Sequence, residues 1–318
     1  MCAAWSGWNA SDPAQKEDML LKLVNFGSLN IDRVYRVRAF VRPGQTISAQ
    51  DFACCAGGKG LNQSLAAARA GAQVLHAGAI GEDGGMLQAL LEESGADTSR
   101  LLHCTGTATG HAVIQVEEGG QNCILVWGGA NHALTEEYVD SVLDACSADD
   151  ILLVQNETSC VKYILEQAAA RGLRAAVNPS PIDPAWADWE MEAVRWFILN
   201  EEEGACLAGL GSGADEDAIL DALAARWPRA AVVLTLGARG VVFRDGGTRC
   251  AHQAYPVKAV DTTGAGDTFC GYFLAGVLAG LPPQECLQNA SRAAALCVMG
   301  AGAAPSIPAM DRVAAFRP

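Results

Sequence analysis

The sequence predicts an α/β fold in which helices cover both faces of a mostly parallel central sheet. Short apolar runs alternate along the chain with amphipathic stretches. Most apolar runs are continuous, as is typical of strands that are buried on both faces. Two other segments alternate polar and apolar residues, which indicates strands with one exposed face. We therefore expect one large α/β domain with a small additional β-sheet.

The central strands are predicted where the continuous apolar runs lie. They cover residues 20–27, 73–81, 150–157, 173–179, 194–202 and 230–237. Helices are predicted between them, at residues 61–70, 86–94, 136–145, 161–171 and 216–226. Strands and helices that alternate in this way build a parallel sheet with helices on both faces.

The two alternating segments each surround a predicted turn. The first covers about 33–57 and contains Pro43 and Gly44, and the second covers 109–127 and contains Gly119 and Gly120. We expect them to form a small β lid over one end of the main domain. That domain would span residues 20–318, after a polar extension at residues 1–19.

Composition limits the class of protein. Half of the 318 residues are apolar and 18% are charged, which is typical of a folded globular chain. The net charge of −14 argues against nucleic-acid binding through a basic surface. We expect no membrane partner, because no apolar segment is long enough to span a bilayer and residues 1–19 do not resemble a signal peptide. The 12 cysteines, among them the adjacent pair Cys54 and Cys55, follow no disulfide or zinc spacing, which favours a cytoplasmic location.

The strongest motif is the segment VDTTGAGDTFCG at residues 260–271, directly before an apolar helix. Gly264, Ala265 and Gly266 leave room for a phosphate at the helix N-terminus, where free N–H groups and the helix dipole attract anions. An acid at Asp267, in the first turn, can accept a proton from an attacking hydroxyl. The competing interpretation is an acid that only stabilises the helix start, but this leaves the glycines and Asp261 unexplained.

Other polar residues follow predicted strands, where ligands of parallel α/β sheets bind. Asn30 and Asp32 follow the first strand and suit the hydroxyls of a sugar, although an Asx turn explains them equally well. Asn200 and Glu203 follow a later strand, where they could organise hydrated Mg²⁺ or simply start a helix.

Two glycine-rich segments have weaker implications. In AGGKGLNQ, from residue 56, glycines surround Lys59, and Asn62 is expected to open a helix. This segment could bind a ligand closely or form an ordinary turn with a helix cap. GLGSGA at 209–214 matches a permissive dinucleotide pattern, but it follows a predicted helix, so we interpret it as a loop.

Together these motifs resemble the ribokinase-like (PfkB) family of sugar kinases from about residue 23 to 308. They occur in the family's order: GSLNID, GGKGLNQ, GGAN, LNEEEG, TLGARG, DTTGAGDTF and GAAPSIP. The resemblance implies ATP-dependent phosphorylation of a small sugar at its primary hydroxyl, with D-ribose converted to D-ribose 5-phosphate as the leading hypothesis. The alternatives are a kinase for another furanose or a nucleoside, a sugar-binding regulator without catalysis, and, from GLGSGA alone, a nicotinamide oxidoreductase.

The resemblance also implies a role for each matching residue. Asp267 would be the catalytic base, and Gly264, Ala265 and Gly266 would donate N–H groups to the transferring phosphoryl group. Sugar binding would fall to Asn30, Asp32, Gly58, Lys59, Gly60, Leu61, Asn62, Glu157 and Asp267. ATP binding would fall to Asn200, Thr235, Leu236, Gly237, Ala238, Arg239, Gly240, Gly266, Asp267 and Ser291. A K⁺ site would involve Asp261, Thr263, Cys297, Gly300, Gly302 and Ser306, while Asn200 and Glu203 would act on Mg²⁺ indirectly.

The resemblance further implies a homodimer that forms through the β lid. Two positions depart from the family's pattern. Asn156 stands before Glu157 where an apolar residue is frequent, which bears on the identity of the sugar. Gly300 stands where a basic residue can occur, which bears on the strength of K⁺ activation.

Overall fold

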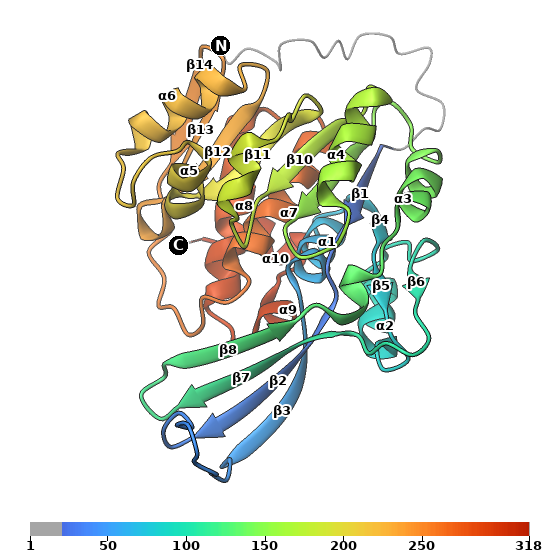
Figure 1. The fold of residues 1–318 in the computed structure, drawn as a ribbon. Helices are drawn as coiled ribbons and strands as arrows, with labels where there is room; N and C mark the ends of the chain where they lie inside the picture. The colour runs from blue at the N-terminus through green and yellow to red at the C-terminus, as the bar shows by residue number, and fades with distance from the viewer. Residues whose placement is uncertain (1–20, 318) are drawn as a thin grey trace.

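The computed structural model describes residues 21–317, so the predicted extension at 1–19 lies outside the described residues. A large α/β body carries a small β-sheet that projects from one side (Figure 1). Among residues 21–317, no helix combines the length and the apolar character needed to cross a membrane.

The body is built on an eight-stranded sheet. In spatial order its strands are β14 (Thr248–His252), β13 (Val241–Asp245), β12 (Ala231–Thr235), β11 (Val194–Asn200), β10 (Arg174–Asn178), β9 (Ile151–Gln155), β1 (Lys22–Phe26) and β4 (Gln73–Ala77). Neighbours from β12 to β4 are parallel, which confirms the predicted sheet. The antiparallel edge strands β13 and β14 were not predicted. The apolar run of β13 has only three residues, and β14 is mostly exposed and carries no such run.

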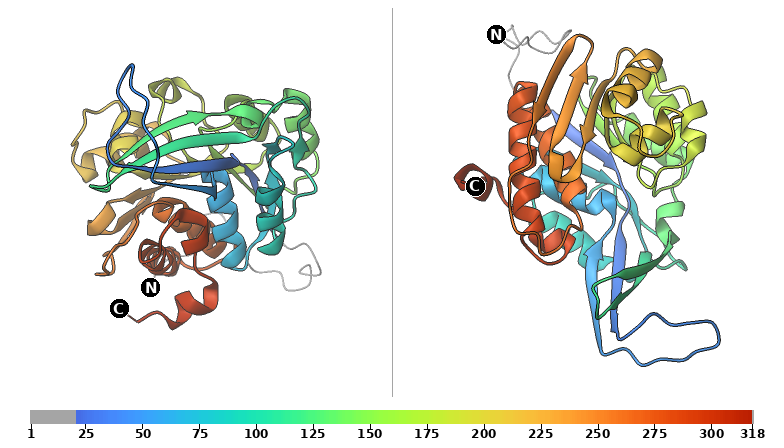
Figure 2. Two further views of the ribbon diagram at one scale, coloured as in Figure 1. Left: turned by 90° about the horizontal axis from the view of Figure 1, so that it is seen from below. Right: turned by 90° about the vertical axis from the view of Figure 1, so that its left-hand side faces the viewer.

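Helices cover both faces of this sheet (Figure 2). One face packs against α1 (Lys59–Arg69), α2 (Gly85–Glu93), α7 (Ala265–Leu278), α8 (Pro283–Val298), α9 (Ala303–Ser306) and α10 (Met310–Ala315). The other packs against α3 (Glu136–Leu143), α4 (Val161–Ala170), α5 (Glu201–Leu207) and α6 (Glu216–Arg226). Successive residues of a strand face opposite sides, so Leu23 joins the first core and Val24 the second.

The five predicted helices are present, with ends within two residues of the prediction. One detail was wrong: α1 begins at Lys59, so Asn62 does not open the helix but lies in its first turn. The helix starts earlier because Gly58 adopts a φ of 99°, which glycine tolerates, and its carbonyl accepts the N–H of Asn62 at 3.1 Å. The predicted strand at 73–81 divides into β4 and β5 (Ala79–Ile80), which pairs with β6 (Leu102–His103) in a separate two-stranded sheet.

The projecting sheet has four strands, in the order β3 (Asp51–Gly57), β2 (Asn30–Val37), β7 (Gly110–Glu117) and β8 (Asn122–Trp127). This confirms the predicted separate sheet. Its strand β2 begins only three residues after β1 ends, so the sheet extends from the carboxyl edge of the central strands. The β7–β8 turn contains Gly120, whose φ is 83° and whose N–H donates to Glu117 O at 2.8 Å.

Helices α1 and α7 approach each other closely. A Cβ added at Gly271 would lie 2.5 Å from Ala66 Cβ and 2.6 Å from the carbonyl oxygen of Gln63, so only glycine fits at this contact. The contact sets the first turn of α7 beside the first turn of α1. Residues that are about 200 positions apart in the sequence therefore meet at one edge of the sheet.

Candidate active site

Asp267 lies at the meeting point of α1 and α7, and it is only 9% exposed. Its Oδ2 accepts a hydrogen bond from Asn62 Nδ2 at 3.0 Å, and its Oδ1 accepts one from Gln63 Nε2 at 2.9 Å. Two amide groups from one helix thus hold the carboxylate of another helix in a fixed orientation. The buried Asn62 Oδ1 has no protein partner among the described residues, so it remains available to a ligand hydroxyl.

The turn before Asp267 forms an anion site. Helix α7 begins at Ala265, after Gly264 with a φ of 76°. A Cβ at Gly264 would lie 2.7 Å from Ala303 Cβ, so both the backbone angle and the packing require glycine. Thr268 is the residue whose N–H donates to Gly264 O, at 2.8 Å. The N–H of Ala265 donates to Thr262 O at 3.3 Å, so the N–H groups of Gly264 and Gly266 are better placed to bind a phosphoryl oxygen beside Asp267.

A cluster of charged groups surrounds Lys59 on the other side of Asp267. Glu157 Oε2 accepts hydrogen bonds from the backbone N–H of Lys59, at 3.1 Å, and from the Ser28 hydroxyl. Burial lowers the pKa of Lys59, but the carboxylates of Asp267, Glu157 and Glu203 outweigh burial and leave this pKa above its ordinary value. Lys59 is therefore a cation held among acids.

Asn30 and Asp32 complete this side of the site from β2. Asn30 Oδ1 accepts from Asn131 Nδ2 at 2.8 Å, and Asn131 Oδ1 accepts the N–H of Leu29 at 2.9 Å. Asp32 lies against the glycine loop, since a Cβ at Gly57 would be 2.2 Å from Asp32 Oδ2. Burial, with a further contribution from Glu157, raises the pKa of Asp32 to about 6.

The structure thus brings together almost all of the residues predicted to bind sugar. The exception is Leu61, whose side chain is fully buried in the core. Asn131 was not predicted to be a site residue, although its motif, GGAN, was recognised. Its role depends on a contact between residues about 100 positions apart, which no local pattern reveals.

A cavity of about 370 Å³ lies on the other side of the α7 start. Six residues predicted to bind ATP line it: Thr235, Gly237, Ala238, Gly240, Gly266 and Ser291. The other four predicted residues do not line it. Leu236 is buried in the core, the Arg239 side chain pairs with Glu201 and Glu216, Asn200 caps α5, and Asp267 faces α1. Residues 254–259 also contribute, with Tyr255 and Val257 among them, and no sequence motif predicted this. The mainly small and apolar lining suits a flat heterocycle.

Asn200 and Glu203 form a capping box at the start of α5. Asn200 Oδ1 accepts the N–H of Glu203 at 2.9 Å, and Glu203 Oε2 accepts the N–H of Asn200 at 3.0 Å. The helix-start interpretation therefore accounts for these contacts. Glu203 still contributes to the negative charge around Lys59, so the pair also shapes the electrostatics of the site.

Asp261 connects two loops beside the anion site: the loop that precedes α7 and the loop between α8 and α9. Its Oδ1 accepts from the N–H and hydroxyl of Thr263, at 2.9 and 2.7 Å, and its Oδ2 accepts the N–H of Gly302 at 2.9 Å. Burial raises the pKa of Asp261, but these hydrogen bonds outweigh it and hold the pKa below its usual value. Gly300 N–H donates to Cys297 O at 3.0 Å, and Ser306 donates to Ala301 O at 3.0 Å.

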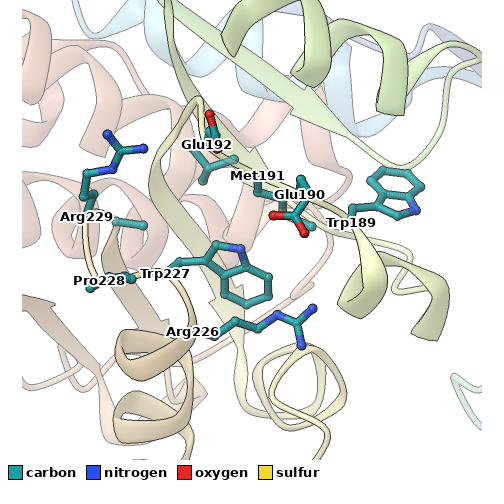
Figure 3. Close-up of a pocket in the computed structure, with 10 residues that line it drawn as sticks. Trp189, Glu190, Met191, Glu192, Arg226, Trp227, Pro228 and Arg229 are labelled. Carbon is teal, nitrogen blue, oxygen red and sulfur yellow. The ribbon is translucent and has the colours of Figure 1, made fainter.

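A second cavity, of about 460 Å³, lies elsewhere (Figure 3). Trp189, Glu190, Arg226 and Trp227 are among the residues that line it. It is close to Val194 and Ala230, at the amino ends of β11 and β12, and so at the opposite edge of the sheet from Asp267. Ligands of parallel α/β sheets bind at carboxyl ends, and we do not include this cavity in the active site.

The fold and site together define a kinase of the three-layer α/β class, in which an acid stands between a polar pocket and a nucleotide-sized cavity. The chain belongs to the pfkB family of carbohydrate kinases, which matches residues 20–310. It is 35% identical over 301 residues to the ribokinase of Haemophilus influenzae, with 92% of this chain and 97% of that protein covered.

Solved structures agree. The Arabidopsis thaliana ribokinase complexed with ribose and ATP has a TM-score of 0.82 and 29% identity, covering 93% of this chain and 98% of that chain. The ribokinase of Cryptococcus neoformans var. grubii in complex with ADP has a TM-score of 0.80 and 32% identity, covering 94% and 99%.

The raised pKa of Asp32 predicts a pH-dependent stability effect. The folded protein binds a proton at Asp32 more tightly than the unfolded chain, so this group favours folding below about pH 4 and that contribution is lost as the pH rises to about 6. In Asp32→Asn the side chain is uncharged at every pH, so the folded variant does not lose stability as the pH rises to about 6. We expect its Tm, relative to the wild type, to be higher at pH 7 than at pH 4, while sugar binding weakens.

Thermal unfolding at both pH values, followed by circular dichroism, tests this expectation. Asp51→Asn, at an exposed position on the neighbouring strand β3, is the matched control. A Tm difference for Asp32→Asn that is the same at pH 4 and pH 7 would show that burial of Asp32 does not act as described.

Proposed function

We propose that the protein transfers the γ-phosphoryl group of ATP to the primary hydroxyl of D-ribose and releases ADP and D-ribose 5-phosphate. The observation that carries this proposal is the position of Asp267. It stands at the N-terminus of α7, between the cavity that Gly266 lines and the polar residues around Lys59. The likeness to ribokinases over nearly the whole chain supports ribose as the sugar.

In this mechanism Asp267 is the general base. It accepts the proton of the sugar hydroxyl as the hydroxyl oxygen attacks the γ-phosphorus and the bond to ADP breaks. The N–H groups at Gly264 and Gly266 bind the oxygens of the transferring group, and the N–H of Ala265 joins them when it leaves its long contact with Thr262 O. Asn30, Asp32, Asn62 and Glu157, with the loop from Gly58 to Gly60, orient the sugar.

ATP needs a divalent cation, and the site suits Mg²⁺ bound mainly by phosphate oxygens and water. Among residues 21–317, no three His, Cys, Asp or Glu side chains converge on a metal position. Mg²⁺ commonly takes few protein ligands and keeps several waters, which is consistent with this arrangement. Asn200 and Glu203 would act on it indirectly, through the electrostatics of the site.

The substrate test is a panel of sugars and nucleosides in a coupled ADP assay. We expect the largest kcat/KM for D-ribose. Asp267→Asn should lower kcat by about 10²–10⁴-fold, because the amide cannot accept the proton, while calorimetry should still detect ribose binding.

Three results would contradict the proposal. A larger kcat/KM for adenosine or for another furanose would show that this compound, and not ribose, is the preferred substrate. Ribose binding without ADP release in the wild type would favour a regulator over an enzyme. Near wild-type turnover by Asp267→Asn would remove Asp267 from its role as the base.

We also propose that the two loops joined by Asp261 bind K⁺. Their available donors are oxygens, including the Asp261 carboxylate and the carbonyls of Thr263 and Cys297, and hard cations prefer oxygen ligands. Gly300 and Gly302 lie in the loop between α8 and α9, and Ser306 is the last residue of α9. One loop leads into α7 and the other leads into α9, whose Ala303 lies against Gly264, so a cation here would stabilise the anion site.

Exchange of K⁺ for Na⁺ tests this proposal. We expect kcat to fall, since the smaller ion fits the same oxygens less well, and we expect Asp261→Asn to lose most of the difference between the two salts. Asp311→Asn, at a surface position on α10, is the control. Equal rates in K⁺ and Na⁺ for the wild type would contradict the cation site.

We propose further that two copies of the chain pair through the small β-sheet. Its edge strand β8 carries Ile124, Leu125, Val126 and Trp127, each about half exposed or more, with Leu125 at 70%. Alternate residues of a strand point to opposite faces, so both faces of β8 present apolar surface. One face can cover the sugar site and the other can pack on a second copy. We propose a cytoplasmic location as well, because the spacing of the 12 cysteines follows no disulfide framework.

A charge at this surface should separate the copies. We expect Leu125→Lys to shift the protein from dimer to monomer in light scattering, because the ammonium group would be buried in an apolar interface. Met86→Lys, at an exposed position on α2, should leave the mass unchanged. A wild type that is monomeric at all concentrations tested would contradict the proposed dimer.

A further inference from the structure

A row of buried polar side chains crosses the central sheet beneath α1. It consists of His76 on β4, Asn25 on β1, Gln155 on β9 and Asn178 on β10. The first three are at most 1% exposed. Asn25 pairs in register with His76, and Gln155 pairs with Asn178. Burial of polar groups in a sheet interior is unfavourable unless they are hydrogen-bonded, so this row needs a physical explanation.

Helix α1 completes the row with Ser64 and Gln63, both fully buried. At one end of the row, His76 Nε2 lies 3.2 Å from the carbonyl oxygen of Gly27. A carbonyl only accepts, so this nitrogen carries the proton and Nδ1 accepts from the Ser64 hydroxyl at 2.8 Å. Burial lowers the pKa of His76 to about 4, so the ring is neutral and this pattern persists near neutral pH.

The direction of each hydrogen bond then follows from the one before it. Asn25 Nδ2 donates to Ser64 Oγ and to the carbonyl of Gly60, both at 2.8 Å. Its Oδ1 must therefore accept, and it accepts from Gln155 Nε2 at 2.9 Å. The other hydrogen of Gln155 Nε2 is donated to Gln63 Oε1, also at 2.9 Å.

Gln63 is left with its amide nitrogen facing Asp267. Gln63 Nε2 donates to Asp267 Oδ1 and to Asn178 Oδ1, each at 2.9 Å. Asn178 is oriented independently, because its Nδ2 donates to the carbonyl of Ile198 at 2.9 Å. Backbone carbonyls at both ends of the row therefore fix which atom Gln63 presents to Asp267.

A reversed Gln63 amide would be unfavourable at its contacts with Asp267, Asn178 and Gln155; its long contact with Cys270 Sγ, at 3.7 Å, tolerates either orientation because a thiol can donate or accept. Its oxygen would face the oxygens of Asp267 and Asn178, and its nitrogen would face the nitrogen of Gln155. Reversal of Gln155 as well would set its oxygen against Asn25 Oδ1. Gln155 Oε1 itself has no partner among the described residues, so it offers no competing hydrogen bond that would favour reversal.

We infer that Gln63 is a positioning residue for phosphoryl transfer, and that the row of His76, Ser64, Asn25 and Gln155 locks its amide so that it always donates to Asp267. This inference rests on the proposed role of Asp267 as the base. With Oδ1 held by Gln63 and Oδ2 by Asn62, the carboxylate keeps the orientation in which a remaining lone pair can accept the hydroxyl proton. Connected buried networks of this kind are rigid, which suits such a role.

The alternative is a purely structural role, in which the row only fills the space under α1. The two roles differ in what they predict for an isosteric change. Gln63→Glu keeps the shape of the side chain, but its carboxyl group can donate to Asp267 only while it is protonated. When it is ionised, two carboxylates face each other, which is unfavourable.

We therefore expect the activity of Gln63→Glu to depend on pH in a way that the wild type does not. At pH 8–9 its kcat should be about 10- to 100-fold below that of the wild type, and the difference should shrink as the pH falls toward about 6. Gln63→Leu should lower kcat by a similar factor at every pH. The KM for ATP should change little in either variant, because Gln63 does not line the nucleotide cavity.

Asp32, whose pKa is about 6, titrates at the lower end of this range in the wild type and in the variant alike, so the ratio of their kcat values is the quantity to compare. Burial and the neighbouring Asp267 raise the thiol pKa values of Cys270 and Cys297, so both stay protonated. The pKa of Lys59 is also raised, so it stays charged. Gln88→Glu on α2 is the matched control, because Gln88 makes the same kind of amide-to-carboxylate hydrogen bond, to Glu92 at 2.8 Å, on the surface.

The outcomes separate this inference from the proposed function. If Asp267→Asn retains turnover, the base assignment is wrong. If Asp267→Asn is inactive while Gln63→Glu has the wild-type kcat at pH 8–9, the positioning role alone is wrong. Should the Gln63 variants fail to fold by circular dichroism, Asn178→Ala, at the half-buried end of the row, should still lower kcat, and a wild-type kcat there would overturn the inference.

Discussion

The site depends on one interaction, the pair of hydrogen bonds from α1 to the carboxylate of Asp267. Asn62 and Gln63 each donate to one of its oxygens, and they do so across the contact between α1 and α7. That contact joins two helices far apart in the sequence, and it sets the N-terminus of α7, the cavity that Gly266 lines and the polar residues around Lys59 about a single acid. A change that separates the helices would disperse all three.

Close packing at glycines makes these hydrogen bonds between α1 and Asp267 possible. Gly271 lets α7 approach α1, and Gly264 lets the turn before α7 pass over Ala303. At Gly60, an added Cβ would lie 2.2 Å from the backbone nitrogen of Ser28, so the start of α1 lies directly on the loop after β1. The glycines of the two sequence motifs therefore serve the contact between elements as well as access for a ligand.

The buried polar row shows that the site also depends on residues that contact no ligand. Asn25, Gln155 and His76 interrupt strands that are otherwise apolar, and each is paired in a hydrogen-bonded path that ends at Asp267. An apolar core could fill the same space, but it could not fix the direction of the Gln63 amide. The same physical rule, that buried polar atoms need partners, thus links the sheet interior to the chemistry at its edge.

The sequence alone determined the class of fold and most of the residues at the site. Continuous apolar strands indicated a parallel sheet, and alternating strands indicated the second sheet. The glycine-rich motif around Asp267 predicted an anion site, and the family resemblance predicted the roles of Lys59 and the residues proposed to bind ATP. These signals are local. Tertiary structure decided the rest: the antiparallel edge strands, the contribution of Tyr255 to the cavity, and the roles of Asn131 and Gln63. These depend on contacts between distant segments, and a polar residue in an apolar strand shows its purpose only when its hydrogen-bond partner is in place.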